Sequence, residues 1–448
     1  MALTATRSGI GLSLACAFVL AGCGMREHRA ELGRLHAVGA YERAAELMDQ
    51  PDIKSWYGKR DRLLWELDRG AIALALDDAD TTFEVLESAE QAIERQFDES
   101  IGDTLSRWLL SDADTTYMPE PYEAVYVNVL KLLAHLEAGV IQGGATVEAR
   151  RLSRKSDRLR ELYVRQRDAL DEKVPGVASD AARRGWINTN VGGEFIESTL
   201  GTYLTAVTFM ESGQHEFQRV AGRRLEDSIA LQGGLIGEVD AAAFAGLGSM
   251  DPDAADVLVV AFAGRGPTKH ASRVGPIVIG TVPMYMELPV VDVVPSGVER
   301  VWVEVEGGPR HELAMVEDLA RVAYENLERG MPVIYTRTFL RAAAKAGLTA
   351  AAAEAARRQA SDSDQVWAQA IVALGGLVTM MVTERADLRS WIFLPGQARV
   401  VLVDLPEGQY RLRVVYEDWR GGTVYVTPWR EIEVREHGLA TIVEHYWD

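Results

Sequence analysis

The chain has 448 residues, of which 48% are hydrophobic and 25% are charged, a balance that indicates a globular protein with room for two or three domains. Its formal net charge of −19 argues against nucleic acid as a partner, because binding to phosphates needs a basic surface. The eight histidines are scattered and there are two cysteines, so neither a zinc site nor a cysteine nucleophile is expected.

The chain begins with the pattern of a secretory signal. One positive charge, Arg7, precedes an apolar run from Ile10 to Ala21, which is shorter than the roughly 20 residues of a membrane-spanning helix. The run ends in Leu20-Ala21-Gly22-Cys23, which resembles the lipobox of bacterial lipoproteins. This resemblance implies cleavage between Gly22 and Cys23, loss of residues 1–22 as a signal peptide, and attachment of lipid to Cys23. The alternative is an ordinary signal peptide followed by a chance cysteine.

The cysteine count favours the lipoprotein interpretation. Cys16 lies in the segment that would be removed, so Cys23 would be the only thiol of the mature chain and could form no internal disulfide. Lipid chains on Cys23 would hold the protein stably on a membrane. Because Gly24 and not aspartate follows the cysteine, the sorting pattern of such lipoproteins implies the periplasmic side of the bacterial outer membrane.

Residues 23–232 show the period of α-helices and little proline. Four segments share a helix, a turn near residue 39, 78, 139 or 213, and a second helix. Glycine at the turns and alanine where the helices would cross resemble tetratricopeptide (TPR) repeats, although the turns do not recur at the usual period of about 34 residues. The sequence predicts a TPR-like α-helical domain, and a helical bundle without a repeat groove is the alternative.

One stretch of this region, residues 150–167, is basic within an acidic protein. The stretch predicts the charged face of a long helix. Such a face is usually solvated, and contact with an acidic partner is the alternative interpretation.

A second domain is predicted over residues 256–448, after a linker at residues 233–255. Residues 256–264 form a continuous apolar run typical of a buried strand, and Val301, Val303 and Val305 alternate with polar residues. The pattern of residues 399–418 predicts a hairpin that turns at Pro406-Glu407-Gly408.

A second hairpin is predicted over residues 430–447, with Gly438 at its turn. A helical insert is expected between residues 311 and 388, and it includes a buried helix at 368–382. The fold class is therefore α+β: an N-terminal TPR-like α-helical repeat domain, followed by a smaller C-terminal domain of strands and hairpins with inserted helices.

A weak candidate for ligand binding is the polar and aromatic group after the insert. Asp387 could accept hydrogen bonds there and Arg389 could clamp an anion, beside Trp391. The alternative is an Asp–Arg pair that satisfies the loop while Trp391 packs below it.

A second candidate is a row of cations at a spacing of four on one predicted helix face: Arg337, Arg341 and Lys345. They could bind an anionic ligand, or meet Asp387 or Glu384. Residues 264–270 contain glycine and Lys269 but lack the spacing of a phosphate-binding loop, so a structural turn is expected. A pocket that gathered Lys269 and His270 with Asp387 and Arg389 would indicate a site.

Several segments together resemble a family of uncharacterised bacterial envelope lipoproteins with TPR-like repeats. They are, in chain order, the lipobox, the irregular helical repeats, "VVAFAGRGPTKH" (259–270), "YTRTFLRAAAKAG" (335–347) and "ADLRSWIFLPG" (386–396). The resemblance implies a place in the cell envelope, and it carries no catalytic residue with it.

The sequence thus predicts a non-enzymatic scaffold or adaptor, anchored by lipid on Cys23, that meets other envelope proteins. No cofactor, metal site or nucleic-acid partner is expected. The alternative is a periplasmic module that binds peptidoglycan or another anionic ligand through its C-terminal domain.

Overall fold

The computed structural model describes residues 28–101, 116–173, 177–188, 196–232, 241–244, 246–251, 255–279, 282–359 and 382–447. Gly22 and Cys23 lie outside these residues, as do parts of the predicted linker and almost all of the helix expected at 368–382. The chain is helical over residues 28–37. The further helices are α2 (Tyr41–Met48), α3 (Pro51–Tyr57), α4 (Arg62–Ala75), α5 (Ala79–Ile101), α7 (Pro121–Glu137), α8 (Thr146–Lys173), α9 (Val177–Arg183), α10 (Thr199–Glu211), α11 (His215–Gln232), α12 (Ala241–Phe244) and α13 (Leu319–Gln359).

The strands form three sheets in the described part of the chain. Their orders are β12-β1-β8-β6, then β10-β9-β4-β5 with β11 also on β9, and β2-β3-β7. The strands are β1 (Val257–Arg265), β2 (Thr268–Ile279), β3 (Val282–Asp292), β4 (Arg300–Val305), β5 (Arg310–Glu312), β6 (Ala314–Asp318), β7 (Val382–Glu384), β8 (Pro395–Val403), β9 (Gly408–Glu417), β10 (Thr423–Val426), β11 (Arg430–Val434) and β12 (Ala440–Tyr446). The α+β class predicted from the sequence is confirmed.

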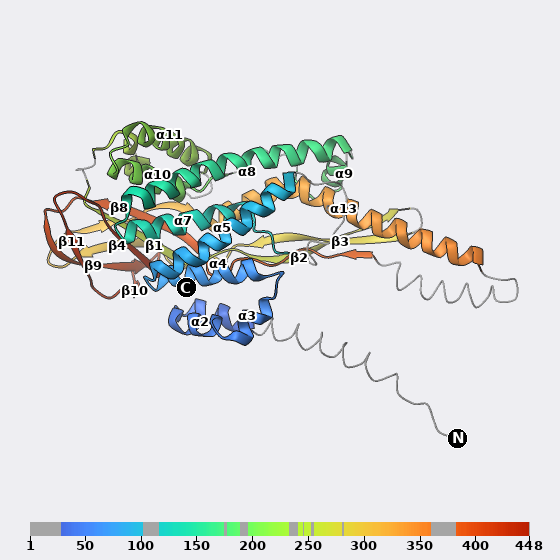
Figure 1. Cartoon of the computed structure of the whole chain (residues 1–448), viewed down its shortest axis with the longest axis horizontal. Helices are drawn as coiled ribbons and strands as arrows, with labels where there is room; N and C mark the ends of the chain where they lie inside the picture. Colours follow the sequence, from blue (N-terminus) through green and yellow to red (C-terminus); the bar gives the residue numbers. More distant parts are fainter. Residues whose placement is uncertain are drawn as a thin grey trace, which may run out of the picture.

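Strand β1 lies at the centre of three packed layers. Leu258, Val260 and Phe262 belong to the core shared with the helices. Val257 and Val259 belong to a second core, between this sheet and the inner face of β4 and β9. Figure 1 shows α4, α5, α7 and α8 lying over the strands. Burial on both faces explains why the sequence of β1 is a continuous apolar run.

Successive helices pack on one another, in the order α4, α5, α7, α8, α10 and α11. Gly39, Gly139 and Gly213 end their helices with positive φ, as predicted, and Asp77 takes this conformation at the turn near residue 78. Strand β12 contacts α4 and α7, while β6 contacts α10. The chain's own sheet therefore covers one face of the helical layer. No described helix is both long and apolar enough to cross a membrane.

Neither predicted hairpin forms. Strands β8 and β9 exist as expected, but β8 pairs with β1 and β6, whereas β9 pairs with β4, β10 and β11. Strand β12 pairs in parallel with β1 and not with β11. Between β8 and β9 the chain crosses from one sheet to the other, where the Asp256 carboxylate accepts the Leu405 N–H at 2.9 Å. Alternating residues suit both arrangements, so the pattern alone could not separate them.

The predicted helical insert begins later than expected. Residues 310–312 and 314–318 are strands β5 and β6, and α13 starts at Leu319. Ala314 lies opposite Val400 of β8, so sheet pairing overrides the helical spacing of this segment.

The glycine at one close helix contact gives a stability prediction. A Cβ at Gly222 would lie 2.5 Å from the Cα of Gly248, whose backbone cannot rotate away. We expect Gly222→Ala to lower the free energy of unfolding by about 1–3 kcal/mol in urea titrations. Gly33→Ala, with nothing within 4 Å of its Cβ, should be neutral or slightly stabilising. Equal effects of the two changes would show that the contact is unimportant.

Candidate functional site

Four predicted site residues meet at the N-terminal end of α7. Lys269 lies near the start of β2, and Asp387, Arg389 and Trp391 lie in the loop between β7 and β8. The loop crosses the start of α7 because strand β8 belongs to the central sheet under the helices. His270, their neighbour in sequence, instead faces Asp292 on the exposed side of the β2–β3 hairpin.

Arg389 is held inside the chain by two carboxylates. Its guanidinium donates to Asp387 at 2.5 and 2.8 Å and to Asp61 at 2.6 Å. The backbone N–H of Arg389 also donates to Asp387, and its guanidinium lies over the ring of Tyr117. The charge predicted to clamp an anion is therefore neutralised by groups of the same protein.

Two acids at the start of α7 hold the rest of the group. Glu120, the residue before α7, forms an ion pair with Lys269 at 2.6 Å. The side chain of Lys269 is only 3% exposed. Glu123 accepts from the Tyr117 hydroxyl at 2.6 Å, from the Glu120 N–H at 2.7 Å and from the Trp391 N–H at 2.8 Å. Burial raises the pKa of Glu123, while the nearby Lys269 charge opposes that shift.

Asp68 of α4 holds the next residues of the same loop. It is fully buried, and its Oδ1 accepts the Ile392 N–H at 2.8 Å and the Phe393 N–H at 3.4 Å. The Leu394 carbonyl then accepts the Gly266 N–H at 2.7 Å, which joins the loop to the turn after β1. Burial raises the pKa of Asp68 to about 7, although the Arg29 charge and these two hydrogen bonds lower it.

We call Asp61, Asp68, Glu120, Glu123, Lys269, Asp387, Arg389 and Trp391 the loop lock. Its members fix a loop that has no strand partner, because buried N–H groups need acceptors. Sequence reasoning missed the four acids that come from the helical half. The spacing Glu120-Pro121-Tyr122-Glu123 was a readable signal, since it forms a capping box in the structure.

The helix-face cations lie elsewhere, on α13. Arg341 is 2% exposed and donates to Thr338 within its own helix at 3.1 Å. Arg337 is partly buried on the same helix, and the side chain of Lys345 lies outside the described residues. The described cations of this row are thus not presented together to solvent.

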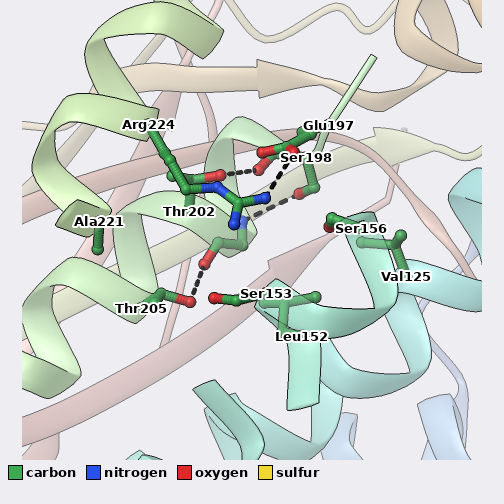
Figure 2. Close-up of a pocket in the computed structure, with 11 residues that line it drawn as sticks. Val125, Leu152, Ser153, Ser156, Glu197, Ser198, Thr202, Thr205, Ala221 and Arg224 are labelled. Atoms are coloured by element: carbon green, nitrogen blue, oxygen red, sulfur yellow. Dashed lines mark hydrogen bonds and ion pairs between the residues drawn. The ribbon is translucent and has the colours of Figure 1, made fainter. Parts of the chain in front are cut away.

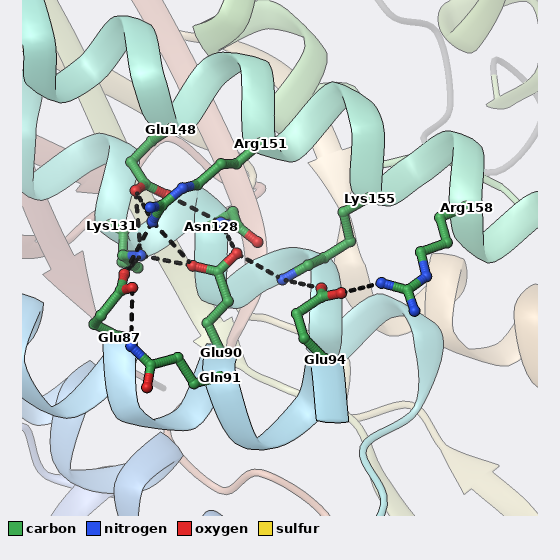
Figure 3. Close-up of polar contacts among 10 residues, drawn as sticks. All are labelled: Glu87, Glu90, Gln91, Glu94, Asn128, Lys131, Glu148, Arg151, Lys155 and Arg158. Carbon is green, nitrogen blue, oxygen red and sulfur yellow. Dashed lines mark hydrogen bonds and ion pairs between the residues drawn. The ribbon is translucent and has the colours of Figure 1, made fainter. Parts of the chain in front are cut away.

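A second polar cluster links α5, α7 and α8 (Figure 3). Lys131 of α7 lies among three carboxylates, at 2.5 Å from Glu87, 2.7 Å from Glu90 and 3.2 Å from Glu148. Lys155 of α8 adds a contact to Glu90 at 3.1 Å. Burial favours a raised pKa for Glu90, but Lys155 and Lys131 lower its pKa to about 2.

This cluster shows how part of the basic stretch is used. Part of the basic stretch 150–167 has an acidic partner in α5 of the same chain: Arg151 contacts Glu87, and Arg158 contacts Glu94. Its other arginines are exposed, as expected for a solvated face. The oxygens of Glu87, Glu90 and Glu148 also lie close enough to hold a metal ion. However, the Lys131 ammonium already occupies the position between them, so the cluster is a network of internal ion pairs.

A small pocket lies between α8, α10 and α11 (Figure 2). Its volume is about 20 Å³, which is room for about one water molecule and far below that of a small-molecule site. Its cation, Arg224, is paired with Glu197 at 2.7 Å and with Asp157 at 3.0 Å. None of the residues proposed from the sequence lines this pocket.

Comparison with models of protein families, with curated proteins and with solved structures finds no match. A function can therefore be inferred only from the residues and their geometry.

The ion-pair cluster predicts a large cost for losing Lys131. Lys131→Met leaves three carboxylates without their central cation in a buried place, and we expect the free energy of unfolding to fall by about 3–5 kcal/mol. Chemical denaturation would measure it. Arg183→Met, which removes an exposed pair with Asp180, should cost less than about 1 kcal/mol. A comparably small loss for Lys131→Met would contradict the assigned role.

The loop lock predicts a pH effect. Asp68 has a higher pKa in the folded protein than in the unfolded chain, so the fold binds its proton more tightly, and stability from this group is lost as pH rises through about 7. Asp68→Asn cannot titrate. When the pH is raised from 6 to 8, the free energy of unfolding of the wild-type protein should fall by about 1 kcal/mol more than that of the variant, as measured by chemical denaturation at each pH. If the free energies of unfolding of the two proteins changed in parallel with pH, the raised pKa of Asp68 would be refuted.

Proposed function

We propose that this protein is a non-enzymatic scaffold of the bacterial envelope, anchored by lipid on Cys23 to the periplasmic side of the outer membrane. The observation that carries the proposal is the start of the chain. A short apolar run ends in Leu20-Ala21-Gly22-Cys23, and Cys23 is the only thiol after that point. The resemblance to envelope lipoproteins supports the same assignment.

The polar clusters favour a scaffold over a glycan-binding module. Lys269 and Arg389, which would have to meet an anionic ligand, are paired within the loop lock, and Trp391 is 1% exposed. The groups that a catalyst or receptor would direct at a ligand are instead used to hold the chain together.

A surface suited to a protein partner is present on α11. Phe217, Val220 and Leu231 lie on one side of this helix and are 50%, 57% and 62% exposed. Exposed apolar side chains at helical spacing are a common feature of protein-binding surfaces. We propose that this α11 stripe contacts another envelope protein.

The anchor is tested by the modification itself. In a bacterial host supplied with labelled palmitate, the full-length protein should incorporate label and sediment with outer membranes. Cys23→Ser should abolish both labelling and membrane retention, since the other cysteine, Cys16, lies in the removed segment. Labelling that survives Cys23→Ser would contradict the assignment of Cys23.

The scaffold role is tested by crosslinking in intact envelopes. The double change Val220→Glu and Leu231→Glu should remove at least one crosslinked partner, because charge on the α11 stripe opposes apolar contact. Val164→Glu, on α8, is the control and should leave the partners unchanged. If the wild-type protein, the double variant and the control variant were crosslinked to the same partners, the α11 stripe would not be the contact surface.

A further inference from the structure

The turn between α3 and α4 is a compact group of cations on an acidic protein. Lys54, Lys59, Arg60 and Arg62 lie within nine residues, and all four are exposed. The whole chain carries a net charge of −19. We call these four residues the basic turn.

Of the acids near the basic turn, Asp61 and Glu66 are already bound, and Asp52, two residues before Lys54, is exposed. Asp61 is bound to Arg389 of the loop lock at 2.6 Å. Glu66 pairs with Arg62 at 3.1 Å and also accepts from Ser88, which leaves Lys54, Lys59 and Arg60 without a carboxylate from either acid. By contrast, the exposed arginines of α8 include pairs such as Arg165 with Glu161 and Arg167 with Asp168.

The backbone presents the middle of the turn outward. Gly58, which ends α3, has φ +53° and ψ −163°, a conformation that side chains disfavour. Lys59 and Arg60 follow it at the tip, while the Arg60 carbonyl accepts the Tyr117 N–H at 2.8 Å. The tip is therefore a fixed part of the fold, with its side chains in solvent.

The basic turn lies close to His28, the first residue that the structure describes. The ring of His28, the first described residue, meets the ring of Tyr57 at the end of α3, with 6.1 Å between centroids. Cys23 precedes His28 by five residues, which span at most about 17 Å when extended. Figure 1 shows α2 and α3 together on one side of the molecule, with α8 and α11 on the opposite side.

We propose that the basic turn binds the anionic phospholipid headgroups of the membrane in which the lipid on Cys23 is inserted. This inference rests on the proposed function for its geometry, since the anchor keeps the turn beside the bilayer. The attraction is local, because charges farther away than about 10 Å are largely screened at 0.1 M salt, so the overall negative charge does not cancel it. The tether also raises the effective concentration of lipid at the turn, which adds to the attraction that the cations exert on their own.

Vesicle binding tests the proposal without the anchor. The protein used is residues 23–448 with Cys23→Ser, which contains every described residue. It should cosediment with phosphatidylcholine vesicles that contain phosphatidylglycerol, and not with phosphatidylcholine alone, and high salt should release it. The double variant Lys59→Gln and Arg60→Gln should bind about 30-fold more weakly.

The matched control removes the same charge elsewhere. Arg165→Gln with Arg167→Gln on α8 should bind as the parent does, and circular dichroism should show all three proteins folded. Equal weakening by both double variants, no weakening by either, or no dependence on phosphatidylglycerol would overturn the proposal. The vesicle experiment does not depend on lipid at Cys23. A negative result in the labelling experiment and a negative result in the vesicle experiment can therefore be told apart.

Discussion

The fold depends on a strand that water never reaches. Strand β1 has a buried residue at every position from Val257 to Ala263, so it needs an apolar layer on each side. The helices supply one layer and the sheet of β4 and β9 supplies the other. Because burial of apolar surface stabilises a fold by roughly 25 cal/mol per Å², this double burial helps to hold the helical and β parts of the chain together.

Double burial also creates a problem at the boundary between helices and strands, where loops enter the interior without a strand partner. Carboxylates solve it in a repeated way. Asp68 and Glu123 accept N–H groups of the loop before β8. Other buried acids accept N–H groups at the ends of secondary structure: Glu137 accepts that of Val443 in the edge strand β12 at 3.2 Å, and Glu317 accepts that of Leu200 in the first turn of α10 at 2.9 Å. Each of these acids has a raised pKa, first because burial disfavours its charge. Because these acids join the layers, the stability of the contact between the layers depends on pH.

Sequence patterns predicted the elements better than their partners. The apolar run of β1, the alternation of Val301, Val303 and Val305 and the left-handed glycines were all readable, because each is dictated by its own neighbours. The two hairpins were wrong because alternation fixes which face is buried but not which strand lies alongside. Four of the proposed site residues, Lys269, Asp387, Arg389 and Trp391, do meet, yet their partners come from residues 61–123, too far away in the sequence for spacing rules to identify them.

The same limit explains how the charges are used. A run of cations in a sequence gives no sign of whether acids will meet it in space. Arg151, Lys155 and Arg158 of the basic stretch form internal contacts, because α5 carries Glu87, Glu90 and Glu94 at helical spacing on the facing side. At the basic turn, Asp61 is bound to Arg389, and Glu66 is bound to Arg62 and Ser88. Within the part of the chain that the structure describes, Lys59 and Arg60 are exposed and form no ion pair, so a negatively charged surface could meet them.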